Sequence, residues 1–127
     1  MAAAAPPVLE VYYSPTCAPC RLELPVLAEF VDRDGTQVRI VILDQEIRAR
    51  NDIRAVSVKL ERAAVSPPRA SPRAVLATAG DTDRILPFAR TLTAAGRICA
   101  TWRGRLTAET GRSLLKACLI SPNRHRS

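Results

Sequence analysis

The stretch VLEVYYSPTCAPCRLELPVL, residues Val8 to Leu27, joins a β-rich segment to a helical one. Its first six residues end at the turn-forming pair Ser14-Pro15, which predicts a strand. Beyond this turn, apolar residues recur at helical spacing and predict a helix; they are Leu22, Val26, Leu27, Phe30 and Val31. Pro25 lies inside this pattern and is expected to kink the helix. Cys17 and Cys20 therefore fall where the strand gives way to the helix.

Two cysteines at such a junction suit thiol–disulfide chemistry. The thiolate is the nucleophile in disulfide exchange, and a free thiol with a pKa of about 8.5 is mostly protonated at neutral pH. The amides and the positive dipole end of a helix N-terminus favour the anion. A second thiol one turn away can resolve the mixed disulfide with a partner. We therefore expect Cys17 to be the exposed attacking cysteine and Cys20 the more buried resolving cysteine.

A Cys-x-x-Cys pair also looks like half of a zinc site, with Cys99 and Cys118 as the other ligands. Zinc ribbons usually bring a second close pair, whereas these two cysteines are 19 residues apart. One falls in a predicted strand and the other in a predicted helix. We therefore predict no metal site.

Further strands and helices follow along the chain. Val38 to Leu43 is almost continuously β-branched or aliphatic, which predicts a strand covered on both faces. After it we expect a helical stretch (45–65), a proline-rich connector (66–72), a short helix capped by Ser71 (72–80), a hairpin (88–92 and 97–102) and a final helix from Thr107. Trp102 alternates with apolar residues of the hairpin and is expected in the core. This order predicts an α/β fold, a mixed β-sheet flanked by helices on both faces.

The bulk composition is that of one globular domain. The chain has 127 residues, of which 47% are hydrophobic, enough to fill a single core. No apolar run approaches the about 18 residues that suggest a membrane span. We expect a domain over residues 8–120, with a flexible start (1–7) and a disordered tail (121–127). The start reads MAAAAPP and lacks the basic residues and apolar stretch of a secretory signal.

The net charge of +7 raises the question of a nucleic-acid partner. The arginines are scattered along the chain, and aromatic residues make up 4% of it, so platforms for base stacking are scarce. We interpret the charge as a solvated basic surface and predict no nucleic-acid partner.

The segment Tyr12 to Leu27 resembles the active-site segment of the thioredoxin superfamily, and most of all the TlpA/ResA-type proteins that work outside the bacterial cytoplasmic membrane. In that pattern a proline follows the second cysteine by five residues and a glutamate by three, and Pro25 and Glu23 hold these places. The resemblance implies a thioredoxin-like fold. A buried Glu23, one helical turn after Cys20, would have a raised pKa and could pass protons to and from the resolving thiol. The alternative is a surface glutamate paired with an arginine.

A second block, LPFARTLTAAGRICATWRGRL at Leu86 to Leu106, resembles the part of the family that faces the two cysteines. Pro87 matches the family's cis-proline, which implies a cis Leu86–Pro87 peptide. In the family the backbone beside this proline pairs with the extended peptide around a partner's cysteine. The alternative is an ordinary proline at the start of a strand. The resemblance further implies that a partner contacts four residues, namely Thr16, Ala18, Pro19 and Leu86.

The chain departs from the family pattern at several places. Thr16 stands where the family usually has tryptophan before the first cysteine. Val11 holds the place of thioredoxin's buried aspartate, and Glu10 is expected to point to the opposite face of the sheet. Gln45 to Arg84 matches no pattern of the family.

Together these patterns predict a thiol–disulfide oxidoreductase that exchanges disulfides with cysteine-containing proteins and a redox partner protein, as a monomer without a cofactor. A non-catalytic interaction module of the same fold is the alternative. The resemblance implies a periplasmic or otherwise extracytoplasmic location, with a cytoplasmic one as the alternative. The Ala18-Pro19 dipeptide has no charge or histidine and leaves the direction of electron flow open. Cys99 and Cys118 form either a disulfide, which an oxidising compartment favours, or two buried thiols.

Overall fold

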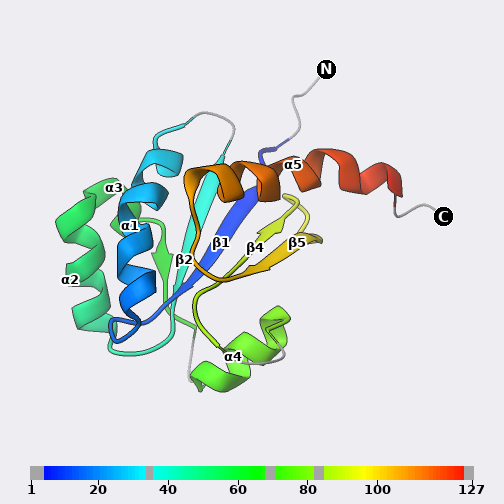
Figure 1. Ribbon diagram of the computed structural model, residues 1–127. Helices are drawn as coiled ribbons and strands as arrows, with labels where there is room; N and C mark the ends of the chain where they lie inside the picture. Colours follow the sequence, from blue (N-terminus) through cyan, green and yellow to red (C-terminus); the bar gives the residue numbers. More distant parts are fainter. Residues whose placement is uncertain (1–4, 34–35, 68–70, 82–84, 125–127) are drawn as a thin grey trace.

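A five-stranded sheet forms the centre of the molecule, in the order β3-β2-β1-β4-β5 (Figure 1). The computed structural model describes residues 5–33, 36–67, 71–81 and 85–124. The strands are β1 (Val8–Tyr13), β2 (Gln37–Ile42), β3 (Ala64–Val65), β4 (Phe88–Leu92) and β5 (Ile98–Arg103). β1 pairs parallel with β2 and antiparallel with β4, so the sheet is mixed. All six residues of β1 are buried, because this central strand is covered on both faces.

Helices pack on both faces of the sheet. They are α1 (Ala18–Val31), α2 (Glu46–Val56), α3 (Val58–Glu61), α4 (Pro72–Ala79) and α5 (Ala108–Arg124). The larger core lies on the face covered by α1 and α5, where Leu9 and Val11 of β1 meet Leu24 of α1. A smaller core lies under α4 on the other face and contains Tyr12 and Leu76. Alternate residues of β1 thus point to opposite cores, as the period of a strand requires.

The predicted helix over 45–65 is wrong in part. Ser57 has extended backbone angles (φ −161°, ψ 123°), so it ends α2, and its hydroxyl accepts the amide of Leu60 at the start of α3. The chain then enters β3, where Ala64 pairs with Ile40 of β2. This pairing with a distant strand overrides the local helical pattern, which could not reveal it.

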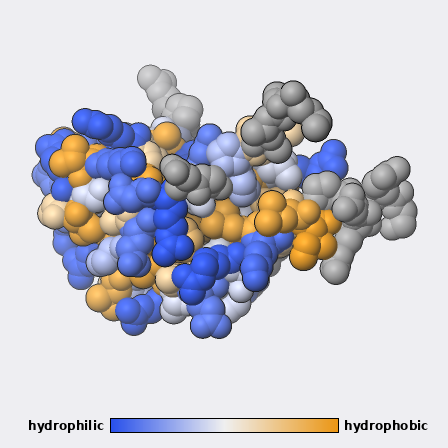
Figure 2. Space-filling view, turned by 90° about the horizontal axis from the view of Figure 1, so that it is seen from above, coloured by the Kyte–Doolittle hydropathy of each residue, from blue (hydrophilic) through white to orange (hydrophobic). Residues whose placement is uncertain are grey.

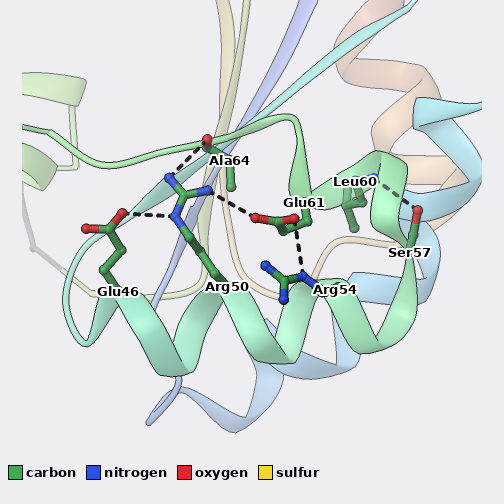
Figure 3. Close-up of polar contacts among 7 residues, drawn as sticks. All are labelled: Glu46, Arg50, Arg54, Ser57, Leu60, Glu61 and Ala64. Carbon is green, nitrogen blue, oxygen red and sulfur yellow. Dashed lines mark hydrogen bonds and ion pairs between the residues drawn. The ribbon is translucent and has the colours of Figure 1, made fainter.

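Arg50 of α2 links this helix to α3 and β3 (Figure 3). Its guanidinium donates to Glu46 at 2.9 Å, to Glu61 at 3.4 Å and to the carbonyl of Ala64 at 3.5 Å. Arg54 also binds Glu61, at 3.4 Å. The edge strand β3 is therefore tied to the helices that precede it, although partly exposed ion pairs of this kind add little stability.

The hairpin of β4 and β5 contains an irregularity at Cys99. Leu92 pairs with Ile98 and Thr91 with Ala100, so Cys99 is an extra residue on β5. Such a bulge re-aims side chains. The predicted core position of Trp102 is wrong, since this residue is 39% exposed on the edge strand and its indole N–H donates to the carbonyl of Arg105.

The last helix, α5, runs to Arg124, whereas we expected the domain to end at residue 120. Helix ends inferred from sequence commonly err by a few residues. Apolar side chains gather on the surface beside the end of α5 (Figure 2), where Leu119 and Ile120 are exposed. Among the described residues, no helix has the length and apolar character needed to cross a membrane. Residues 5–7 have no regular secondary structure, and Pro7 accepts a backbone bond from Gln37; residues 1–4 and 125–127 lie outside the described residues.

Candidate active site

The turn from β1 into α1 places the first cysteine at the start of a helix. The amide of Cys17 donates to the carbonyl of Ser14 at 3.0 Å, which closes a tight turn. Cys17 has an extended backbone and is the N-cap residue of α1. Pro19 lies in the first turn of the helix, where a missing N–H costs no hydrogen bond. The helix therefore starts at the cysteine pair, as we expected.

Cys17 and Cys20 form a disulfide. The amide of Cys20 donates to Cys17 Sγ at 3.2 Å, so a helix N-terminal N–H points at the first sulfur. Cys20 is 1% exposed, whereas Cys17 is partly exposed and its neighbours Thr16, Ala18 and Pro19 are exposed. The sulfur of Cys17 is the one that a partner can reach. The same N–H and the positive end of the helix would stabilise Cys17 as a thiolate after reduction.

A groove of about 450 Å³ opens beside Cys17. It is lined by residues from four parts of the chain: Ser14, Thr16, Cys17, Ala18, Pro19, Leu43, Asp44, Pro72, Arg73, Leu76 and Leu86. The walls are polar and apolar in similar measure, and Arg73 and Asp44 bring one charge of each sign. Three of the four predicted partner-contacting residues flank Cys17 in sequence, and the structure brings Leu86 to them from 69 positions further along the chain.

The predicted cis peptide between Leu86 and Pro87 is confirmed. Pro87 directly precedes β4, and its carbonyl accepts the amide of Gly104 at 3.0 Å. Gly104 has a φ of 119°, a backbone conformation that favours glycine. Pro87 itself is partly buried and does not belong to the groove lining, whereas Leu86 does. Leu86 rather than Pro87 therefore brings this strand end to the groove.

Glu23 is buried on the same face of α1 as Cys20, with 1% of its surface exposed. Its carboxylate accepts the amide of Leu106 at 2.6 Å, so the alternative of a surface glutamate is wrong. Burial raises the pKa of Glu23 to about 7, although the Leu106 amide and the charge of Arg105 act in the opposite direction. Glu23 can therefore hold or release a proton near neutral pH, one helical turn from the buried cysteine.

Glu10 plays no part in this site. It lies on the face of the sheet opposite Glu23, where Arg39 and Arg90 donate to it at 2.8 Å and 2.6 Å and the Tyr12 hydroxyl also donates. Burial alone would raise the pKa of Glu10, but the bonds from Tyr12 and Arg90 and the two positive charges lower it below the ordinary value. Glu10 is thus an ionised structural carboxylate that points away from the site, as we expected, and Val11 lies in the core.

Ser14 and Asp44 belong to the site, and sequence reasoning missed both. The buried hydroxyl of Ser14 donates to Asp44 at 2.8 Å and lies 2.9 Å from the hydroxyl of Thr16. Asp44 comes just after β2, a strand parallel to β1. The carboxyl ends of parallel strands meet at one edge of the sheet, so the positions of Ser14 and Asp44 just after two such strands could have predicted that they lie together.

No protein-family model and no curated protein sequence matches the chain. Solved structures do match it. A thioredoxin-related protein from Neisseria meningitidis serogroup B has a TM-score of 0.72 at 22% identity, over 91% of this chain and 87% of that one. The chain has the thioredoxin fold. The exposed lipoprotein thioredoxin Etrx1 from Streptococcus pneumoniae strain TIGR4 gives 0.66 at 18% identity, over 89% and 85%. A secreted Mycobacterium tuberculosis disulfide oxidoreductase homologous to E. coli DsbE gives 0.64 at 11%, over 92% and 83%.

The thioredoxin fold confirms the predicted mixed sheet flanked by helices. The region from Gln45 onward, whose sequence matches no pattern of the family, supplies α2, α3, the edge strand β3 and α4. Pro72, Arg73 and Leu76 of α4 line the groove beside Cys17. A segment without recognisable sequence pattern thus contributes one wall of the site.

A second disulfide joins Cys99 of β5 to Cys118 of α5. Neither cysteine lines the groove beside Cys17. The four cysteines therefore form two separate pairs, and the alternative of two buried free thiols is wrong. The bulge at Cys99 and the packing of α5 on β5 bring these cysteines together, with a Cα–Cα distance of 5.0 Å.

Proposed function

We propose that this protein is a thiol–disulfide oxidoreductase that exchanges disulfides with protein partners through Cys17 and Cys20. The observation that carries the proposal is their disulfide at the first turn of α1, with one sulfur open to a groove and the other buried. The description of the secreted M. tuberculosis protein of the same fold as a disulfide oxidoreductase supports it. Thiol exchange needs no cofactor or metal, and we propose none.

The exchange starts, for the oxidised protein, with the attack of a partner thiolate on Cys17 Sγ. A bond forms between the two sulfurs, the Cys17–Cys20 bond breaks, and Cys20 leaves as a thiolate that takes up a proton. A second partner thiolate then attacks the partner sulfur bound to Cys17. Cys17 leaves as a thiolate, and the partner keeps a disulfide. The protein gains two electrons and the partner loses two; a reduced protein reduces a partner disulfide by the same steps in reverse.

Glu23 is our candidate for the proton carrier in this exchange. It is buried on the same helix face as Cys20, and its pKa of about 7 lets it give a proton to the departing thiolate and take it back in reverse. Pro87 is proposed to hold the adjoining strand end in place for an extended partner segment. Thr16, Ala18, Pro19 and Leu86, which surround Cys17 on the groove, are proposed to contact that segment.

The partners we propose are cysteine-containing proteins and a redox partner protein outside the cytoplasm. The Cys99–Cys118 disulfide supports this location, because such bonds persist in oxidising compartments. The descriptions of two proteins of the same fold, one an exposed lipoprotein and one secreted, agree with it. We propose that the protein acts as a monomer without a nucleic-acid partner.

Trapping a mixed disulfide tests this function. The Cys20→Ser variant is reduced and then mixed with insulin, whose disulfides are the probe. We expect an adduct on a non-reducing gel that dithiothreitol releases, because no resolving thiol is left to free Cys17. The matched control is the Cys99→Ser, Cys118→Ser variant, in which the wild-type rate of insulin reduction should persist.

The Cys17→Ser variant completes the test. It should form no adduct and reduce no insulin. If Cys20→Ser forms no adduct and the wild-type protein reduces no insulin, the oxidoreductase proposal fails and a non-catalytic interaction module becomes the better description.

A further inference from the structure

Three polar side chains form a hydrogen-bonded row beside Cys17. Asp44 accepts from Ser14 at 2.8 Å, and the Ser14 and Thr16 hydroxyls are 2.9 Å apart. The amide of Thr16 also donates to the Ser14 hydroxyl, at 3.3 Å. The row is anchored at the sheet edge, since the amide of Leu43 donates to the carbonyl of Tyr13 at 2.9 Å. Thr16, the residue before Cys17, is thus held by the loop after β2 as well as by its own turn after β1.

The direction of the bonds in this row follows from counting protons. A carboxylate such as Asp44 has no proton to donate, so the single hydroxyl proton of Ser14 points to Asp44. The Ser14 oxygen can then only accept from Thr16. The hydroxyl proton of Thr16 is therefore directed inward, to Ser14. Because its proton is already used, the Thr16 hydroxyl oxygen offers only free lone pairs to its surroundings. It is therefore an acceptor and not a donor.

This acceptor lies where a partner must approach. Thr16 is exposed, precedes Cys17, and lines the same groove as Cys17 and Leu86. A protein bonded to Cys17 brings its own backbone N–H groups next to its cysteine, and each of them needs an acceptor once water is displaced. A backbone N–H is also the one donor common to partners of every sequence. An oriented acceptor at Thr16 therefore suits a polypeptide, whereas a small dithiol without N–H or O–H groups has no strong donor to offer it.

We propose that Thr16 Oγ accepts a hydrogen bond from a backbone N–H of the polypeptide whose cysteine bonds to Cys17. Ser14 and Asp44 are positioning residues that hold this oxygen as an acceptor. The inference rests on the proposed function and adds to it the contact by which an extended peptide dithiol or disulfide is preferred to a small thiol. The covalent steps are those already given for the exchange at Cys17.

The test compares two reductants of the Cys17–Cys20 disulfide in the intact oxidised protein. One is a short uncharged peptide with two cysteines, and the other is butane-1,4-dithiol, which has neither an N–H nor an O–H group. Samples are quenched with an alkylating agent and analysed by mass spectrometry. We expect Thr16→Val to lower the ratio of the peptide rate to the butane-1,4-dithiol rate by about two- to tenfold, the range for one neutral hydrogen bond. Thr16→Ser, which keeps the hydroxyl, should restore the ratio.

The positioning role has its own readout in a double-mutant cycle. Asp44→Ala frees the Ser14 proton to turn toward Thr16, so it should lower the same ratio in the wild-type background and have no further effect in Thr16→Val. Thr101→Val is the matched control, because Thr101 is exposed on β5 and does not line the groove.

The outcomes separate the two proposals. If Thr16→Val leaves the ratio at its wild-type value while Cys17 still exchanges with both reductants, this inference is overturned and the proposed function stands. The same holds if Thr16→Val slows both reductants equally. If neither reductant opens the Cys17–Cys20 disulfide, the proposed function is overturned, and the inference with it.

Discussion

Replacing Glu23 by glutamine should change how the stability of the protein depends on pH. In the folded protein Glu23 keeps its proton up to about pH 7, whereas in the unfolded chain it loses the proton near its ordinary value of 4.5. Between these values the folded state binds more protons, so the free energy of unfolding falls as the pH rises and levels off above about 7. At about 1.4 kcal/mol for each pH unit, the full loss is about 3 kcal/mol. Glu23→Gln has no proton to lose and should not show this loss.

The measurement is the free energy of unfolding in guanidinium chloride without reductant, from about pH 4 to about pH 9. The decisive quantity is the difference between wild type and Glu23→Gln at each pH, because groups such as Glu10 are common to both and largely cancel. The matched control is Glu29→Gln, an exposed glutamate on the same helix, whose curve should run parallel to that of the wild type. Parallel curves for Glu23→Gln as well would refute the assignment of a buried carboxyl with a raised pKa.

Three other changes test interactions that hold the fold together away from the site. Gly111→Ala places a Cβ 2.7 Å from Cζ of Phe30, and we expect a loss of about 1–3 kcal/mol in denaturant unfolding; wild-type stability would mean that the ring moves freely. The double variant Cys99→Ala, Cys118→Ala removes the second disulfide and should lower the free energy of unfolding by about 3 kcal/mol; an unchanged denaturant midpoint would contradict this. Glu10→Gln should cost about 3 kcal/mol at neutral pH. The cost should shrink as the pH falls below about 4.5, because the unfolded chain then binds a proton that the folded carboxylate, with its lowered pKa, still resists; a cost independent of pH would contradict the ion-pair assignment.

The site itself was only partly predictable. Cys17 and Cys20 are close in sequence, and their spacing at a strand-to-helix junction indicated both the chemistry and the order of exposure. The burial of Glu23 was left open, because a glutamate on a helix is buried or exposed according to what packs on it. That partner is Leu106, 83 positions away. Ser14 and Asp44 went unnoticed because their bond depends on how the ends of β1 and β2 meet.

Local sequence determined the elements whose signals are short-range. The β-rich run of β1, the helix that begins at Cys17 and the hairpin of β4 and β5 follow from residues within one element, so composition and periodicity suffice. Tertiary structure alone decided where distant residues meet. It split the stretch after Gln45 to form β3, exposed Trp102 on an edge strand, and brought Cys99 to Cys118 through a bulge. Burial and strand pairing depend on the whole packed chain, and for this reason no short window of sequence contains them.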